Sequence, residues 1–294
     1  MKSQFFIGWL CFAFSLGNQV WAQPMRWSLQ EYPPAVMPIN GKPGLGFRDN
    51  ELRLIVANWP EVEHQFVVAN IARTWLMLGD KEPICTLGAL RTPEREKIAY
   101  FTPVAILPPL QLIVREDTVS KLPLNAQGEV LLQELLASTT LKGLLVHLRS
   151  YGKGLDEVIA QRTVKDAVFM VQASDVGKSI PLMLAAKRGD YIIEYEFVVN
   201  FYKQQNFAKL DHLIALPIAG FSDALTTNAV CPRTPWGQQA IRRIDAILTK
   251  TADSNGVRSG VEKWLSPETI KRYKSDMNAF ALRRKKPADP AQFE

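Results

Sequence analysis

Short apolar runs alternate with stretches of helical spacing along most of the chain, beginning near residue 26. In the first part, β-prone runs predict strands at residues 26–30, 63–68 and 84–88, and amphipathic spacing predicts helices at 47–59 and 70–78. Asn70 is placed to cap the second helix. Strands alternating with helices are typical of mostly parallel sheets covered by helices, so the expected fold class is α/β.

A second unit repeats this alternation after a break in the pattern. The extended run LQLIVR at residues 110–115 is followed by a polar segment rich in Pro, Gly and Asn at 121–128. Beyond it the pattern predicts strands at 141–148, 168–171 and 191–193, with helices at 130–137, 152–161, 175–187 and up to 204. Two extended runs, 213–218 and 226–230, return toward the first unit, and helices follow at 235–250, 257–265 and 267–280.

This organisation predicts two lobes, each a mostly parallel sheet flanked by helices, joined by two crossover strands that form a hinge. The expected boundaries place residues 23–110 and 226–281 in lobe 1 and residues 111–225 in lobe 2, and a length of 294 residues allows two domains. Ligands of open α/β sheets bind beyond the carboxyl ends of the strands. The cleft between the lobes is therefore the expected site.

Residues 1–22 have the pattern of a cleaved signal peptide. Met1 and Lys2 precede an apolar run at 5–16, and Val20, Trp21 and Ala22 resemble an A-x-A cleavage site. The alternative is a membrane anchor, but the run is shorter than the roughly 20 residues that span a bilayer. We expect export to the periplasm of a Gram-negative cell.

The cysteines predict a disulfide, and the distribution of charge predicts a disordered C-terminal tail. In an oxidising compartment the pair Cys85 and Cys231 predicts a disulfide, with two buried free thiols as the alternative. The formal net charge is +6, with basic residues concentrated at 283–286 beside prolines, so we expect residues 282–294 to form a disordered tail. The alternative is contact with anionic lipid or nucleic acid, and we expect no nucleic-acid partner.

Catalytic and metal-binding patterns are weak. His64, His147 and His212 are scattered without metal-ligand spacing, and no nucleophile motif stands out. Gly177, Lys178 and Ser179 resemble the end of a phosphate-binding loop, but Gln172 occupies the position of its first glycine. We expect no metal, no cofactor and no catalytic residue.

The stretch GALRTPEREKIAYFTP, from Gly88 to Pro103, predicts an anion clamp. A strand runs into a helix start in which Thr92 can act as the cap and Pro93 suits the first position. Free backbone N–H groups at the helix start and the two parallel N–H donors of the Arg95 guanidinium can together bind a carboxylate. The alternative is that Arg95 pairs with an internal acid.

Three other candidates follow predicted strand ends. Tyr32 offers an aromatic face before Pro33 and Pro34, or forms part of a surface turn. Ser150 and Tyr151 precede a helix and could bind a carboxylate or phosphate. The same sequence pattern occurs at any helix start that is capped by a hydroxyl residue, so it is not specific for a binding site. Glu194 could receive a ligand ammonium, or could favour the start of its own helix.

Taken together, these positions resemble the type 2 periplasmic solute-binding proteins (extracellular solute-binding protein family 3), the amino-acid-binding subunits of ABC importers. The resemblance extends over about residues 26–280. It rests on TPEREKIAYFTP in the first lobe, GDYIIE in the second, and TTNAVCPRTPWGQQAIRRIDAIL in the return segment.

The resemblance implies that Arg95 holds the ligand's α-carboxylate and that Glu194 takes its α-amino group. It also implies a return strand beside the third strand, which would bring Cys85 close to Cys231. Amino-acid binders of this family usually have Ser or Thr five residues before the clamp Arg, where this chain has Leu90, so a hydroxyl contact is lost. Thr92 could supply the missing hydroxyl only if the turn between the strand and the helix differs from the turn usual in the family.

The expected function is that of a monomeric periplasmic binding protein that captures a small carboxylate-bearing solute, such as an amino acid, for an ABC permease. Lobe closure would exclude water, and Tyr32 and Tyr151 would supply aromatic burial. One alternative is a sensory protein that docks on a membrane receptor. Another is an enzyme resembling periplasmic cyclohexadienyl dehydratases, with His147 or Glu31 as acid or base.

Overall fold

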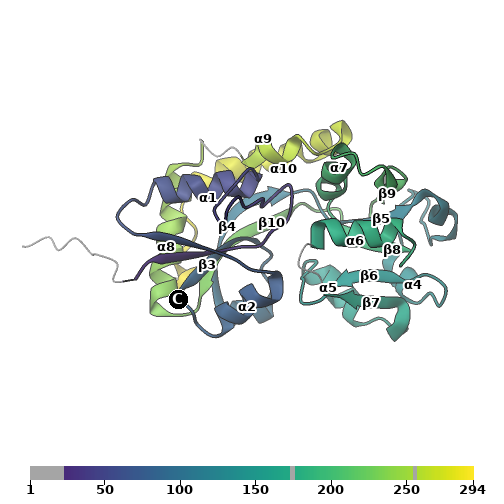
Figure 1. Cartoon of the computed structure of the whole chain (residues 1–294), viewed down its shortest axis with the longest axis horizontal. Coiled ribbons are helices and arrows are strands. Elements are labelled where there is room, and N and C mark those ends of the chain that lie inside the picture. The colour runs from purple at the N-terminus through teal and green to yellow at the C-terminus, as the bar shows by residue number, and fades with distance from the viewer. Residues whose placement is uncertain (1–22, 173–175, 254–256) are drawn as a thin grey trace, which may run out of the picture.

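The structure is a computed structural model of the chain, and it describes residues 23–172, 176–253 and 257–294. The expected signal peptide, residues 1–22, lies outside the described residues. Two lobes lie side by side in Figure 1, each built on its own five-stranded sheet. None of the helices in the described ranges is long and apolar enough to cross a bilayer.

The first sheet has the strand order β2-β1-β3-β10-β4. Its strands are β1 (Met25–Leu29), β2 (His64–Val68), β3 (Ile84–Ala89), β4 (Ala99–Leu107) and β10 (Leu225–Pro232). β1 is parallel to β2 and β3, whereas β10 is antiparallel to β3 and β4. The helices of this lobe are α1 (Phe47–Ala57), α2 (Ile71–Gly79), α3 (Pro93–Glu96), α8 (Pro235–Lys250), α9 (Val257–Glu262) and α10 (Pro267–Arg284).

The second sheet has the order β7-β6-β8-β5-β9. Its strands are β5 (Gln111–Arg115), β6 (Gly143–Val146), β7 (Val168–Val171), β8 (Tyr191–Glu194) and β9 (Leu213–Leu216), and its helices are α4 (Leu132–Leu136), α5 (Lys153–Ala160), α6 (Val176–Ala185) and α7 (Glu196–Gln204). β5 is antiparallel to both neighbours. The chain crosses into this lobe between β4 and β5 and returns between β9 and β10.

Burial of the central strands explains why these segments form sheets. All four residues of β6 and of β8 are buried, as expected for parallel strands covered on both faces. Trp27 and Ile55 are fully buried in the first lobe, and Leu145 and Tyr191 are fully buried in the second. The α/β fold class and the two-lobed architecture predicted from the sequence are confirmed.

The strand expected at residues 141–148 is shorter than predicted. β6 ends at Val146, and Leu148 has a φ of 61°, a left-handed conformation that cannot continue a strand. The backbone N–H of His147 still donates to the carbonyl oxygen of Val171 in β7 at 2.9 Å, and the chain leaves the sheet from Leu148 onward.

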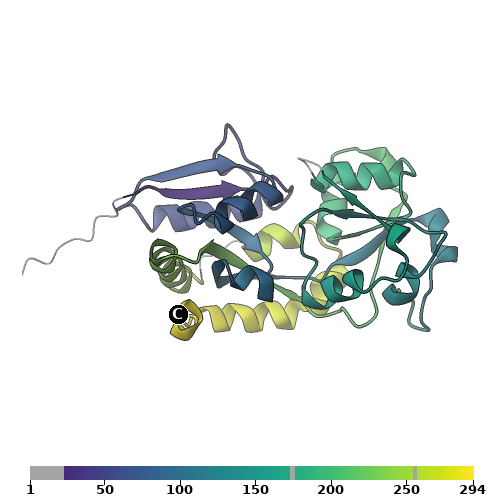
Figure 2. The ribbon, with the colours of Figure 1, turned by 90° about the horizontal axis from the view of Figure 1, so that it is seen from below.

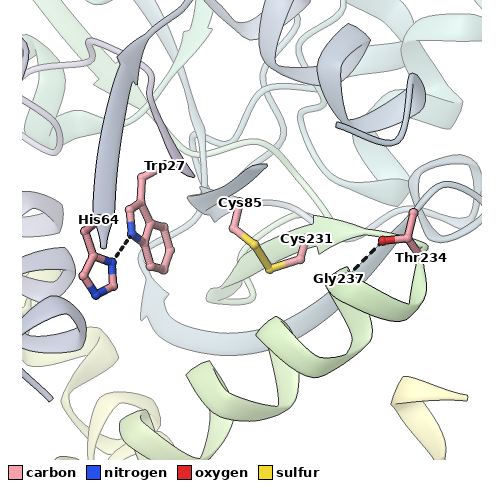
Figure 3. The surroundings of a disulfide bond; sticks show 6 residues. All are labelled: Trp27, His64, Cys85, Cys231, Thr234 and Gly237. Atoms are coloured by element: carbon pink, nitrogen blue, oxygen red, sulfur yellow. Dashed lines mark hydrogen bonds between the residues drawn. A yellow bond between two sulfur atoms is a disulfide. The ribbon is translucent and has the colours of Figure 1, made fainter. Parts of the chain in front are cut away.

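A disulfide joins Cys85 on β3 to Cys231 on β10, as predicted (Figure 3). The two Cα atoms are 4.4 Å apart, because β10 returns beside β3 in the first sheet. Both residues are fully buried. The bond closes a loop across a sequence separation of 146 that contains the whole second lobe.

The C-terminal segment differs from the disordered tail expected for residues 282–294. α10 continues to Arg284, whose guanidinium is buried and pairs with Asp245 of α8 at 2.9 Å. The short helix η4 (Pro290–Phe293) follows, and only 3% of Phe293 is exposed. The prediction was wrong because it relied on charge and proline, whereas a buried acid and an apolar anchor hold this segment. Figure 2 shows α10 lying along the first lobe, with the C-terminus beside it.

Replacing Phe293 with Ala should lower the free energy of unfolding by about 1.5–3 kcal/mol, because the apolar surface of a buried phenyl ring is lost. Urea unfolding of the two proteins measures the difference. Leu282→Ala is the matched control, since Leu282 is 67% exposed and its removal should change stability by less than about 0.5 kcal/mol. Equal losses in the two variants would contradict the anchoring role of Phe293.

Candidate functional site

A cavity of about 450 Å³ lies between the two lobes. The first lobe contributes residues that follow β1, residues at the start of α2, and residues at the end of β3. The second lobe contributes residues 146–150 after β6, the end of β7, the start of α6 and the segment after β8. The cavity thus lies where the sequence predicted a site, at the carboxyl ends of strands from both lobes.

Arg95 is positioned by the single helical turn α3. Thr92 caps this turn by accepting a hydrogen bond from the Arg95 backbone N–H at 3.3 Å, and the guanidinium lies 4.1 Å from the centre of the Trp75 ring. Its Nη1 donates to the carbonyl oxygen of Leu90 at 3.0 Å, and its Nη2 donates to that of Leu148 at 3.3 Å.

The direct contacts of the Arg95 guanidinium are these carbonyl oxygens and the ring. Among the residues that the structure describes, no carboxylate forms an ion pair with it. Burial lowers the pKa of Arg95 to about 10, partly offset by the more distant Asp156, so the guanidinium remains charged at neutral pH. Arg95 is a half-buried cation in the cavity wall.

Gly88, at the end of β3, brings the backbone close to a second arginine. Its φ is +91°, which favours glycine, and a Cβ there would lie 3.4 Å from Nε of Arg48. Arg48 also lines the cavity, but it is buried and pairs with Glu51 at 2.9 Å while donating to Thr227. Its charge is therefore compensated inside lobe 1.

In the second lobe, Arg149 forms a two-bond ion pair with Glu194. The Nη1 to Oε2 distance is 2.6 Å and the Nη2 to Oε1 distance is 2.7 Å. The side chains are 9% and 2% exposed. Glu194 Oε1 also accepts hydrogen bonds from the Tyr195 backbone N–H at 2.8 Å and from the Tyr32 hydroxyl. The carboxylate is thus surrounded by donors.

Three tyrosine rings enclose the guanidinium of this pair. Its Cζ lies 5.4 Å from the centre of the Tyr32 ring, 5.1 Å from Tyr151 and 5.9 Å from Tyr195. Burial is the largest single effect on the pKa of Arg149 and lowers it, but the attraction of Glu194, Tyr32 and Tyr151 and the hydrogen bond to Glu194 together outweigh it and raise the pKa well above its ordinary value. Burial likewise raises the pKa of Tyr32, which stays protonated at neutral pH.

Three of these hydrogen bonds cross the cleft. Tyr32 belongs to the first lobe, yet its hydroxyl donates to Glu194 and accepts from Arg149 Nη2 at 3.0 Å. Arg95 of the first lobe donates to Leu148 of the second. The lobes are therefore in direct contact on both sides of the cavity.

The cavity brings together four of the seven predicted ligand-binding residues, namely Tyr32, Gly88, Arg95 and Ser150. The Ser150 hydroxyl is already engaged, because it donates to Asp156 at 2.5 Å. Tyr151 is buried behind the wall and its hydroxyl accepts from the Val146 N–H at 2.8 Å. Thr92 acts as the helix cap described above.

The role expected for Glu194 requires a correction. It is not part of the cavity wall, and Arg149 engages both of its carboxylate oxygens. A ligand ammonium could reach it only by displacing that guanidinium. The family resemblance implied a carboxylate available to a ligand ammonium, whereas in the folded chain Arg149 neutralises it.

Sequence reasoning missed two residues of the site. Arg149 directly precedes Ser150 and Tyr151 in a segment that had been singled out, so its charge was an available signal. Trp75 lies on α2, and only the fold places its ring under Arg95. Within the described ranges, no group of three or more His, Cys, Asp or Glu residues is arranged to hold a metal ion.

Comparison with known proteins supports the fold. No protein-family model matches the chain, and no curated protein matches it by sequence. A histidine kinase sensor domain similar to periplasmic binding proteins superimposes with a TM-score of 0.63 at 17% identity, covering 83% of this chain and 96% of that one. An ancestral arginine-binding protein bound to arginine superimposes with a TM-score of 0.62 at 14% sequence identity, and the match covers 83% of this chain and 98% of that one.

A putative L-cystine ABC transporter protein from Listeria monocytogenes gives a TM-score of 0.60 at 16% identity, covering 83% of this chain and 96% of that one. At these identities the likeness concerns the fold alone. The chain therefore has the two-lobed fold of the type 2 periplasmic binding proteins, which the sequence motifs had indicated.

Proposed function

We propose that this protein is a periplasmic solute-binding protein that captures a small carboxylate-bearing solute between its lobes for an ABC importer. The observation that carries the proposal is Arg95, a charged guanidinium in the cavity wall whose partners are two carbonyl oxygens and a ring. Solved structures of the same fold include the substrate-binding protein of an amino acid ABC transporter. As part of this proposal, the lobe boundaries lie near residues 110 and 225.

A ligand carboxylate would bind to the Arg95 fork in place of its weaker carbonyl partners. Charge-assisted hydrogen bonds contribute about 1.5–3 kcal/mol each, whereas micromolar binding requires about 8 kcal/mol. The remainder has to come from apolar burial. The cavity supplies it through walls that include Val36, Ile71 and Leu107.

Lobe movement would control access to this site. Because one oxygen that now accepts from Arg95 belongs to Leu148 of the second lobe, opening the cleft would remove that partner and leave the guanidinium available. Entry of a carboxylate and renewed closure would then exclude water and strengthen the ion contact.

Arg95→Gln should weaken binding of a carboxylate ligand by roughly 10- to 150-fold, the equivalent of about 1.5–3 kcal/mol. A thermal-shift screen of small carboxylic acids and amino acids finds ligands, and calorimetry on the best one measures the change. Arg91→Gln is the matched control, because Arg91 is exposed and pairs with Glu96 instead of lining the cavity. Equal affinity in wild type and Arg95→Gln would refute the proposal.

A sensory role is the second candidate, because a histidine kinase sensor domain is among the solved structures of this fold. The same cavity would then report ligand occupancy to a membrane receptor. Affinity capture of membrane proteins with the purified chain separates the two roles. Recovery of a signalling protein without a permease would favour the sensor.

An enzymatic role has weaker support. Glu31 and His147 both line the cavity, but both are exposed to solvent. Two solvent-exposed side chains do not form an enclosed catalytic centre that excludes water. Turnover of prephenate by the purified protein would reverse this conclusion.

A further inference from the structure

A molecule bound to Arg95 would also contact the cavity wall of the second lobe, and the charges of that wall limit which ligands can bind. A zwitterionic amino acid brings an ammonium group as well as a carboxylate, and an ammonium removed from water needs a compensating acid. The carboxylate predicted for that purpose, Glu194, accepts two hydrogen bonds from Arg149, one from Tyr32 and one from the Tyr195 backbone.

Arg149 replaces that acid on the cavity surface. Arg149 lines the cavity, whereas Glu194, its ion-pair partner, does not. An ammonium approaching this wall would therefore face a cation. Among the described residues that line the cavity, the one acidic side chain is Glu31, which is exposed to solvent.

Much of the rest of the wall is apolar, with polar side chains at Gln30, Asn70 and Gln172. Val36, Ile71, Leu87, Leu107, Val146 and Phe197 all line the cavity. Leu90 contributes an aliphatic side chain close to Arg95, at the position where a hydroxyl would have offered the ligand a polar contact. A volume of about 450 Å³ lies within the range of about 300–1,000 Å³ typical of small-molecule sites, which leaves room for an aromatic ring.

We propose that the solute is an apolar or aromatic carboxylic acid that lacks an α-amino group, and that Arg149 excludes amino acids by occupying Glu194. This inference rests on the proposed function and deepens it. Arg95 binds the carboxylate, the apolar wall covers the body of the acid, and Arg149 determines the specificity.

Matched probes test the inference on the wild-type protein. Calorimetry should show that 3-phenylpropionate binds at least about ten-fold more tightly than L-phenylalanine, which differs from it by one ammonium group, because a buried charge without a partner costs at least that much. Phenethylamine, which has the ammonium but no carboxylate, should not bind. Tighter or equal binding of L-phenylalanine would overturn the inference.

A variant tests the role of Arg149 directly. Arg149→Met exposes the Glu194 carboxylate, so the affinity ratio should move toward L-phenylalanine by about ten-fold or more. Arg188→Met is the control, since Arg188 is exposed and does not line the cavity. An unchanged ratio in Arg149→Met would overturn the assignment. If this variant does not fold, the wild-type comparison still decides the ligand class.

The two proposals fail in different ways. If L-phenylalanine or another amino acid binds as tightly as its desamino analogue and Arg95→Gln weakens both, the proposed function stands and this inference falls. If neither the aromatic and aliphatic acids nor any amino acid binds, both proposals fall.

Discussion

Glu194→Gln is expected to destabilise the protein by about 3–5 kcal/mol, because Arg149 would keep its charge at 9% exposure without a counter-ion. A neutral amide can replace some hydrogen bonds but cannot compensate the buried cation. Urea unfolding of the wild type and the variant measures the difference.

The double variant Arg149→Met, Glu194→Leu is the matched control. Removing both charges together and filling the space with apolar side chains should restore much of the stability, since a buried ion pair is often no better than a hydrophobic replacement. A loss below about 1 kcal/mol in Glu194→Gln would mean that Arg149 is not held as a buried ion pair.

Replacing both Cys85 and Cys231 with Ala is expected to cost about 2–5 kcal/mol. The disulfide constrains the unfolded chain across a sequence separation of 146, for which the chain-entropy model gives about 5 kcal/mol. Chemical denaturation with and without a thiol reductant measures the contribution.

The reductant provides an internal control. It should lower the stability of the wild type toward that of the double variant and leave the variant unchanged. Identical unfolding midpoints for the wild type under oxidising and reducing conditions would show that the bond does not stabilise the fold.

Under the proposed ligand class, the Arg149–Glu194 pair links stability to specificity. The two-bond contact compensates a buried cation, and in that proposal it also excludes a ligand ammonium. Tyr32 adds a third partner from the opposite lobe. Substitutions at this pair should therefore be judged by ligand preference as well as by stability.

Local patterns in the sequence anticipated much of the fold. The runs around Trp27, Cys85 and Tyr191 became strands because short apolar runs rich in β-prone residues are typical of strands buried in a sheet, and local composition reveals them. Caps such as Asn70 and Thr92 were predictable because they bond within three residues, to the N–H groups of Arg73 and Arg95. The C-terminal segment was not, because its anchors are Asp245 and the core around Phe293.

By itself, the sequence determined the α/β alternation, the two lobes and the place of Arg95 at the helix start after β3, since each depends on periodicity, caps or the order of elements. The cysteine count favoured a disulfide between Cys85 and Cys231, and the fold brought the two residues together on neighbouring strands. Only the tertiary structure decided that Arg149 neutralises Glu194 and that Tyr32 reaches across the cleft. Those contacts join residues 45 and 162 positions apart, and the balance of charge at such distances depends on which side chains the folded chain brings together.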